Sequence, residues 1–253
     1  MLRAEDLVKT YKGKTVVNHV SIQVEQGEIV GMLGPNGAGK TTTFYMCVGL
    51  IKPNQGSIYL DDTDITTQPM YRRARLGLGY LAQEASVFRT LTVEENIRAV
   101  LQMTKLSHKE QKQKVEELID EFSLHKVRKS LGRVLSGGER RRTEIARTLA
   151  VNPRFVLLDE PFAGVDPLAV EEIQSIVYHL KHKNIGILIT DHNADAILSI
   201  TDRAYVMSLG NMFAQGTPEE LVSNETVKEH YLGKYYTLNR KFRKEEIDLK
   251  LNR

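Results

Sequence analysis

Residues 29–43, IVGMLGPNGAGKTTT, decide the fold of this 253-residue chain. The apolar run Ile29–Leu33 predicts a buried strand, and Gly34 to Thr41 match the phosphate-binding pattern G-x-x-x-x-G-K-[ST]. The glycines let backbone N–H groups point at phosphate oxygens, so this phosphate loop (residues 34–41) predicts a site for a nucleoside triphosphate. Lys40 would neutralise the β- and γ-phosphates, and the Thr41 hydroxyl would hold Mg²⁺. A glycine-rich turn with an unrelated lysine, the alternative, does not explain the preceding strand.

Composition limits the classes of protein to consider. The chain is 41% hydrophobic and 26% charged, which is ordinary for a globular protein, and its net charge of +3 is too small to argue for a nucleic-acid partner. No run approaches the roughly 18 consecutive apolar residues of a membrane-spanning helix, and the first residues lack the apolar core of a signal peptide. We therefore expect a cytoplasmic protein without direct membrane insertion, which would reach a membrane only through a partner chain.

The rest of the sequence alternates short apolar segments with helical patterns. Capping boxes that begin at Thr92 and Ser107 predict two helices, and Asp166-Pro167 and Thr217-Pro218 predict the starts of two more. Strands that alternate with helices around a phosphate loop indicate an α/β fold with a parallel sheet. Besides 29–33, strands are predicted at residues 2–8, 14–20, 21–25, 57–60, 76–82, 155–158, 186–190, 204–207 and 212–215.

Two features that could suggest chemistry are interpreted as structural. Asp61, Asp62 and Asp64 fall in a predicted hairpin turn, where aspartate is favoured for its backbone hydrogen bonds, so we do not interpret them as metal ligands. Cys47 is the single cysteine, which excludes an internal disulfide. It lies in the apolar helix behind the phosphate loop, and we expect a buried, inert thiol.

Polar residues lie at the ends of three other predicted strands. Gln83 could reach a metal ion or an attacking water with its carbonyl oxygen. Of the adjacent pair Asp159-Glu160, one carboxylate could hold Mg²⁺ and the other could polarise water. His192 is placed to contact a γ-phosphate, although a structural histidine is the alternative.

The segment LSGGER, residues 135–140, precedes another helix. A helix that begins with serine and two glycines offers free N–H groups to an anion, although a glycine turn before a helix is the plain alternative. Since the chain already has one phosphate loop, a second anion site suggests that two chains close on the same nucleotide.

Together these segments resemble the ATP-binding subunits of ABC transporters: GPNGAGKTT, Gln83, LSGGE, LLDEP, GVD at residues 164–166, and TDH at 190–192. The resemblance covers about residues 1–235. It implies one nucleotide-binding domain, residues 1–238, and a charged tail, 239–253. That domain would have an α/β P-loop NTPase core (about 1–83 and 153–216) with a parallel sheet, an N-terminal antiparallel β subdomain, an inserted helical subdomain (about 84–152) and a C-terminal helical part (217–238).

The resemblance also implies roles for single residues. Glu160 would be the general base for water, His192 would sense the γ-phosphate, and Lys40 and Gln83 would complete the catalytic set. Thr41, Gln83 and Asp159 would hold Mg²⁺. From its position alone Tyr11 is as consistent with a surface tyrosine as with an adenine platform, and the resemblance favours stacking. The ATP-binding residues implied are Tyr11, Gly34, Asn36, Gly37, Ala38, Gly39, Lys40, Thr41, Thr42, Ser136, Gly137, Gly138 and Asp166, with Ser136 and Gly138 binding the ATP of the opposite protomer in a head-to-tail homodimer.

Residues 74–97 and 135–167 resemble more closely the ATPases of lipopolysaccharide export, which act on the cytoplasmic face of the inner membrane with two transmembrane permease subunits. In that family residues 84–89, EASVFR, would receive a coupling helix of the membrane subunits through Phe88 and Arg89; an ordinary apolar contact is the alternative for Phe88. A branched-chain amino-acid importer ATPase remains the nearest rival. A soluble ABC ATPase would need a coiled coil or a second cassette, and a nucleotide-binding regulator would not need both Glu160 and His192.

Overall fold

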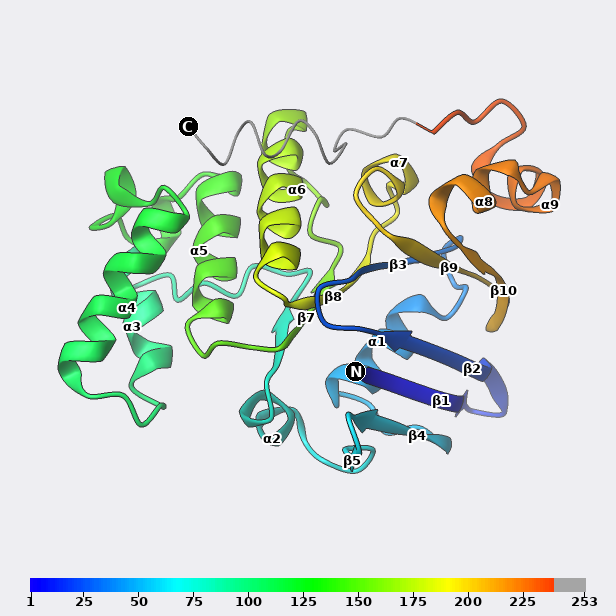
Figure 1. The fold of residues 1–253 in the computed structure, drawn as a ribbon, viewed down its shortest axis with the longest axis horizontal. Coiled ribbons are helices and arrows are strands. Elements are labelled where there is room, and N and C mark those ends of the chain that lie inside the picture. Colours follow the sequence, from blue (N-terminus) through cyan, green and yellow to red (C-terminus); the bar gives the residue numbers. More distant parts are fainter. Residues whose placement is uncertain (239–253) are drawn as a thin grey trace.

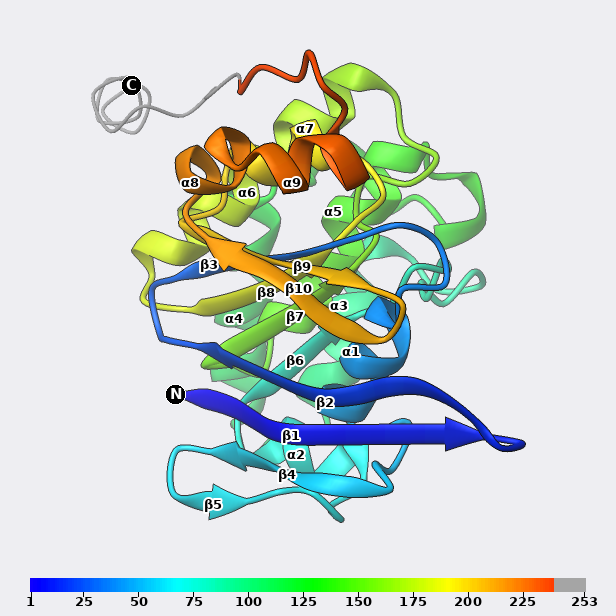
Figure 2. The same ribbon diagram turned by 90° about the vertical axis from the view of Figure 1, so that its right-hand side faces the viewer.

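The computed structural model describes residues 1–238, so the predicted charged tail lies outside the described residues. Two sheets form the body of the protein, and Figures 1 and 2 show the larger one with helices above it and the smaller one below. In the described residues, no helix is both long and apolar enough to cross a membrane.

The larger sheet has the strand order β10-β9-β3-β8-β7-β6. All its strands run parallel except β10, which pairs antiparallel with β9. The predicted parallel sheet is thereby confirmed, and the carboxyl ends of β3, β6, β7 and β8 lie along one edge. These six strands are β3 Ile29–Leu33, β6 Leu78–Leu81, β7 Phe155–Asp159, β8 Gly186–Thr190, β9 Arg203–Ser208 and β10 Asn211–Gly216.

The smaller sheet is antiparallel, with the order β2-β1-β4-β5. Its strands are β1 Leu2–Tyr11, β2 Lys14–Val24, β4 Gln55–Leu60 and β5 Thr63–Asp64. The prediction of separate strands at 14–20 and 21–25 is wrong, because β2 is continuous: His19 has a φ of 51°, but pairing with β1 resumes at Val20. An irregular residue inside a ladder bends a strand without ending it.

Helices cover the larger sheet and fill the segment between β6 and β7. The helices are α1 Lys40–Val48, α2 Met70–Arg75, α3 Val93–Leu101, α4 His108–Glu121, α5 Gly137–Leu149, α6 Pro167–His182, α7 Ala194–Leu198, α8 Pro218–Ser223 and α9 Glu225–Val227. Short 3₁₀ turns occupy His125–Val127 and Gly132–Val134, and a π-helical turn occupies Lys228–Leu232. Thr92, Ser107, Asp166 and Thr217 are N-caps as predicted, and all except Asp166 lie within capping boxes.

The core is divided by the larger sheet. Ile29 and Leu33 of β3 belong to a cluster that includes apolar residues of α3 to α7, whereas Val30 and Met32 pack with α1 and the antiparallel sheet. This alternation follows from the period of two of a β-strand. Both faces of β3 are therefore buried, which fixes the position of the phosphate loop at its end.

The aspartates at positions 61 and 64 make hydrogen bonds within the chain, and Cys47 is buried. Asp61 accepts from Arg154 Nη1 at 2.5 Å and from the N-terminal amine, and Asp64 accepts from Thr66 N at 2.8 Å. Cys47 is fully buried, and burial raises the pKa of its thiol to about 12, in agreement with the predicted inert thiol.

Candidate active site

The phosphate loop joins β3 to α1 and depends on glycine at two positions. Gly34 has a φ of 144° and a Cβ there would lie 2.2 Å from the Met207 carbonyl oxygen. Gly39 has a φ of 99°, and its Cβ would lie 2.6 Å from the Val16 oxygen. Gly39 is also the N-cap of α1 and makes no side-chain cap, so the first-turn N–H groups of α1 are not capped by a side chain. A phosphate fits these donors.

Lys40 lies buried against its own loop. Its Nζ donates to the carbonyl oxygens of Gly34 at 2.6 Å and Pro35 at 3.1 Å. Burial lowers the pKa of the Lys40 ammonium, and the negative charges of Glu160 and Asp191 oppose that shift. The ammonium is thus positioned by backbone oxygens and lies in the field of two carboxylates.

Glu160 brings together three of the four predicted catalytic residues. It follows β7 with a φ of 43°, and its N–H donates to the Thr190 oxygen at 2.7 Å, which ties it to the end of β8. Gln83 Nε2 donates to Glu160 Oε2 at 2.8 Å, and His192 Nδ1 lies 3.7 Å from the same oxygen. Residues that are far apart in sequence therefore meet at the edge where β6, β7 and β8 end.

Asp159 is the buried neighbour of this cluster, with 1% of its surface exposed. Both its carboxylate oxygens lack a hydrogen-bond partner among the described residues. Burial and then the charge of Glu160 raise its pKa to about 6, and the Tyr45 phenol, the charge of Arg141 and the Tyr80 phenol act in the opposite direction. A buried carboxylate with unused oxygens is costly unless a cation pairs with it, so Asp159 together with the exposed residue Thr41 fits a Mg²⁺ ion bound with the phosphates.

Asp191 is a residue of this site to which sequence reasoning assigned no role. It is fully buried at the end of β8, and its oxygens accept from Phe162 N and Asn193 N, each at 3.0 Å. It also lies 3.3 Å from His192 Nδ1 and acts on the charge of Lys40. Its place directly before His192 was visible in the sequence, but its burial was not.

The signature segment, residues 135–139, lies at the start of α5. Ser136 is the N-cap, accepts from Glu139 N at 3.4 Å and donates to Glu139 Oε2 at 2.8 Å. Ser136 is exposed, and Gly137 and Gly138 are partly exposed. Figure 1 shows α5 among the helices on the left and α1, the helix that follows the phosphate loop, to the right of β7.

Comparison with known proteins identifies this arrangement. The family model described as "ABC transporter" matches residues 17–163, from β2 to just beyond the Asp159-Glu160 pair. The chain belongs to the ABC transporter family. The ATP-binding subunits of this family hydrolyse ATP, and this chain is an ABC-type ATPase. The α/β fold class and the enzyme class predicted from the sequence are both confirmed.

Curated ABC relatives match along almost their whole length. The lipopolysaccharide export system ATP-binding protein LptB of Haemophilus influenzae is 54% identical over 239 residues, 94% of this chain and 99% of the relative. The protein of the same name from Escherichia coli K12 is 53% identical over 238 residues, with the same coverage. A crystal structure of an ABC transporter ATP-binding cassette in its ADP conformation has a TM-score of 0.82 at 29% identity, and covers 92% of this chain and 99% of that one.

Two further residues implied by the ABC resemblance, Tyr11 and Asp166, have no contact with Glu160 among those described above. Tyr11 ends β1 in the hairpin with β2, the strand whose Val16 abuts Gly39. Asp166 is the N-cap of α6 and accepts from Ala169 N at 3.0 Å. Each of the two is exposed, and a ligand could reach it.

Phe88 and Arg89 form a separate surface between β6 and α3. Phe88 is 48% exposed, and the Arg147 guanidinium carbon lies 5.1 Å from its ring centroid. Arg89 is exposed too, and its carbonyl accepts from Arg133 N at 3.1 Å. An exposed aromatic ring beside cationic side chains suits a partner segment with apolar and acidic residues.

Proposed function

We propose that this chain is the Mg²⁺-dependent ATPase subunit that drives lipopolysaccharide export, working on the cytoplasmic face of the inner membrane. The observation that carries the proposal is the 54% identity, over 94% of this chain, to a curated ATP-binding protein of a lipopolysaccharide export system. A match over 99% of that relative leaves little of it without a counterpart here.

Catalysis would consist of positioning and charge stabilisation, because phosphoryl transfer needs little covalent chemistry from the protein. Lys40 would exchange its contacts with the loop carbonyls for phosphate oxygens. Glu160, held by Gln83, would accept the proton of the attacking water, and His192 would contact the γ-phosphate. Mg²⁺, bound by Thr41, Gln83 and Asp159, would neutralise phosphate charge.

The active unit would be a head-to-tail homodimer with two ATP molecules. Its support is the signature segment, whose exposed Ser136 begins α5, a helix that Figure 1 shows on the other side of β7 from α1. The start of such a helix can bind an anion. In a dimer, Ser136 and Gly138 of one copy would bind the ATP held by the other. An isolated copy would then bind ATP and hydrolyse it slowly.

Replacing Glu160 with glutamine tests the catalytic assignment. Glu160→Gln keeps the hydrogen-bonding shape but cannot take a proton at neutral pH, so ATP turnover falls by at least about 100-fold. ATP binding persists, and light scattering with ATP shows dimers accumulating. Glu117→Gln, which alters an exposed glutamate of α4, serves as the matched control with wild-type turnover. Rapid steady hydrolysis by Glu160→Gln would refute the general-base role.

The transport assignment is tested through the membrane partners. We expect the chain to co-purify with two transmembrane subunits that, in vesicles, extract lipopolysaccharide when ATP is added. Phe88→Ala is expected to weaken that association about tenfold or more, since exposed aromatic anchors carry much of an interface's energy. Leu209→Ala, at a residue 86% exposed in the β9–β10 turn, is the control. Recovery of importer-type permeases in place of these subunits would overturn the export assignment.

A further inference from the structure

Glu144 lies in the middle of α5 and is buried, with 2% of its side chain exposed. Its Oε1 accepts from the N–H groups of Ser86 at 2.6 Å and Val87 at 3.1 Å. Both amides belong to the coupling segment, residues 84–89, and they lie 58 and 57 positions from Glu144 in the sequence. A buried carboxylate that accepts two backbone N–H groups fixes their positions strongly, because charged acceptors make the shorter and stronger hydrogen bonds.

Arg141, one helical turn earlier on α5, connects Glu144 to the nucleotide site. Its Nη1 lies 3.2 Å from Glu144 Oε2 and donates to the Ala82 oxygen at 2.7 Å. Its Nη2 donates to the backbone carbonyl oxygen of Asp159 at 3.3 Å. The Arg141 guanidinium thus contacts the backbone at two proposed metal ligands. One contact is at Ala82, directly before Gln83, and the other is at Asp159 itself.

Side chains of α5 and α3 also hydrogen-bond to the backbone of Ser86 and Phe88. Arg147, one turn after Glu144, donates to the Ser86 oxygen at 2.7 Å. Asn96 of α3, which has no exposed surface, accepts from Phe88 N at 2.8 Å and donates to Phe88 O at 3.1 Å. Three consecutive amides, those of residues 86–88, are thus bound by side chains of two helices.

From these contacts we infer that Glu144 is a positioning residue that locks the coupling segment onto α5. Force applied at Phe88 then moves α5 and its signature segment as one body, since side chains of α5 and α3 hold the backbone of residues 86–88. Through Arg141 the same body contacts Asp159. This inference rests on the proposed function, which makes Phe88 the site where membrane subunits act.

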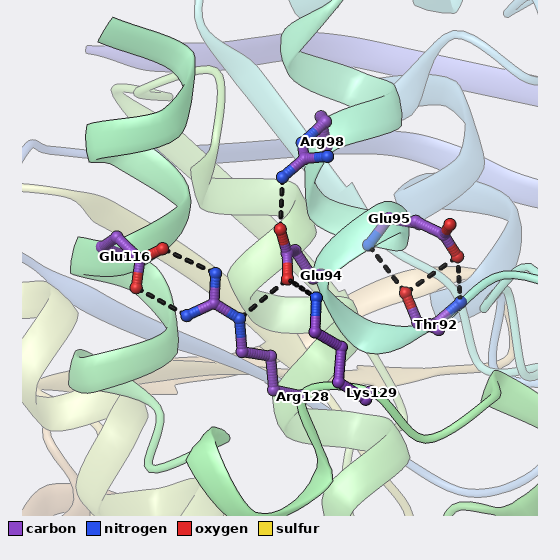
Figure 3. A network of polar contacts seen from close by, with 7 residues as sticks. All are labelled: Thr92, Glu94, Glu95, Arg98, Glu116, Arg128 and Lys129. Atoms are coloured by element: carbon purple, nitrogen blue, oxygen red, sulfur yellow. Dashed lines mark hydrogen bonds and ion pairs between the residues drawn. The ribbon is translucent and has the colours of Figure 1, made fainter. Parts of the chain in front are cut away.

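A second buried glutamate provides the matched control. Glu94 of α3 accepts from Arg98, Arg128 and Lys129, and Arg128 in turn binds Glu116 of α4, as Figure 3 shows. These bonds tie α3 to α4 and to residues 128–129, and none of them reaches residues 82–88. Glu94→Gln therefore removes a comparable buried charge without releasing the coupling segment.

Amide hydrogen exchange of the full chain tests the positioning. Glu144→Gln removes the charged acceptor, and Glu144→Asp keeps the charge opposite Arg141 but shortens its reach. Both should accelerate exchange at Ser86 and Val87 about tenfold or more relative to the wild type. Glu94→Gln should leave these two amides unchanged. Wild-type exchange at Ser86 and Val87 in both Glu144 variants would overturn the inference; Glu144→Asp decides the matter if Glu144→Gln does not fold.

The functional consequence is measured in complexes with the membrane subunits that co-purify with the wild-type chain. The readout is substrate transported per ATP hydrolysed, a ratio that does not depend on the basal turnover of each variant. We expect a fall of at least about threefold in the Glu144 variants, and the wild-type ratio in Glu94→Gln. A wild-type ratio in the Glu144 variants, despite accelerated exchange, would refute transmission through Glu144. If the subunits carry a substrate other than lipopolysaccharide, the export assignment fails, and the same ratio for that substrate still decides the role of Glu144.

Discussion

Replacing Asp159 with asparagine is expected to stabilise the protein in the absence of nucleotide and Mg²⁺. Burial, followed by the charge of Glu160, raises the pKa of Asp159 from 3.8 to about 6. Keeping this carboxylate ionised in the folded state therefore costs about 3 kcal/mol at pH 7 and above. The folded state binds the proton of Asp159 more tightly than the unfolded state does. Protonation therefore stabilises the fold, and this contribution to the free energy of unfolding is complete below pH 3.8. It is lost as the pH rises to about 6.

Denaturant unfolding at pH 8 and at pH 4.5 measures the effect. At pH 8, Asp159→Asn should raise the free energy of unfolding by about 1 to 3 kcal/mol, the lower value applying if the new amide also lacks hydrogen-bond partners. At pH 4.5 the gain should be much smaller, because the wild-type carboxyl is then mostly protonated. The same variant should lose most of the stabilisation that Mg²⁺ and ATP give the wild type.

Asp191→Asn is the matched control, since that carboxylate is equally buried but accepts hydrogen bonds from Phe162 N and Asn193 N. Removing a satisfied charge should destabilise the protein at pH 8 by about 1 to 3 kcal/mol. The reasoning fails if Asp159→Asn is no more stable than the wild type at pH 8, since the ionised carboxylate would then impose no cost on the fold.

Three further predictions concern the surroundings of the phosphate loop. Gly39→Ala should lower the free energy of unfolding by at least about 2 kcal/mol, measured with denaturant, because its Cβ would lie 2.6 Å from the Val16 oxygen. The same variant should bind ATP more weakly in a titration. Gly37→Ala, with open space around its Cβ, is the control and should lower the free energy of unfolding by about 1 kcal/mol through backbone strain. Arg73→Met should lower the free energy of unfolding by about 3 kcal/mol or more, because the buried guanidinium donates to carbonyls at the end of α1; a smaller loss would contradict this. Cys47 should react with a thiol reagent only after unfolding, since burial raises its pKa to about 12, and fast labelling of the native protein would be the contrary result.

The parts of the fold that the sequence predicts are those with local causes. The phosphate loop follows from glycines whose backbone angles other residues rarely adopt, as at Gly34 and Gly39. The starts of α3 and α4 follow from Thr92 and Ser107, whose side chains bond backbone groups three residues away. In each case the determining contact lies within a few residues, so a single sequence shows it.

Features that depend on contacts between residues far apart in the sequence are not predicted by the sequence alone. Helix α2, Met70–Arg75, has one buried residue, Arg73, and no apolar face to give a helical period. The contacts of Glu144 with the coupling segment join residues 57 or more positions apart, and a glutamate in a charged helix reads as a surface residue. Such buried polar contacts can be found only when the packing of the helices is known.

The side chains proposed to act on ATP are already engaged within their own chain. Lys40 donates to the Gly34 oxygen, Gln83 to Glu160, and Ser136 to Glu139. Exchanging one hydrogen bond for another changes the free energy little, whereas leaving a buried charge unpaired is costly. The nucleotide can therefore replace these contacts without unfolding the site, and until it does these side chains remain hydrogen-bonded within their own chain. In the proposed head-to-tail dimer, the last of these exchanges, at Ser136, would take place with the ATP of a second copy, and hydrolysis would then be coupled to dimer closure.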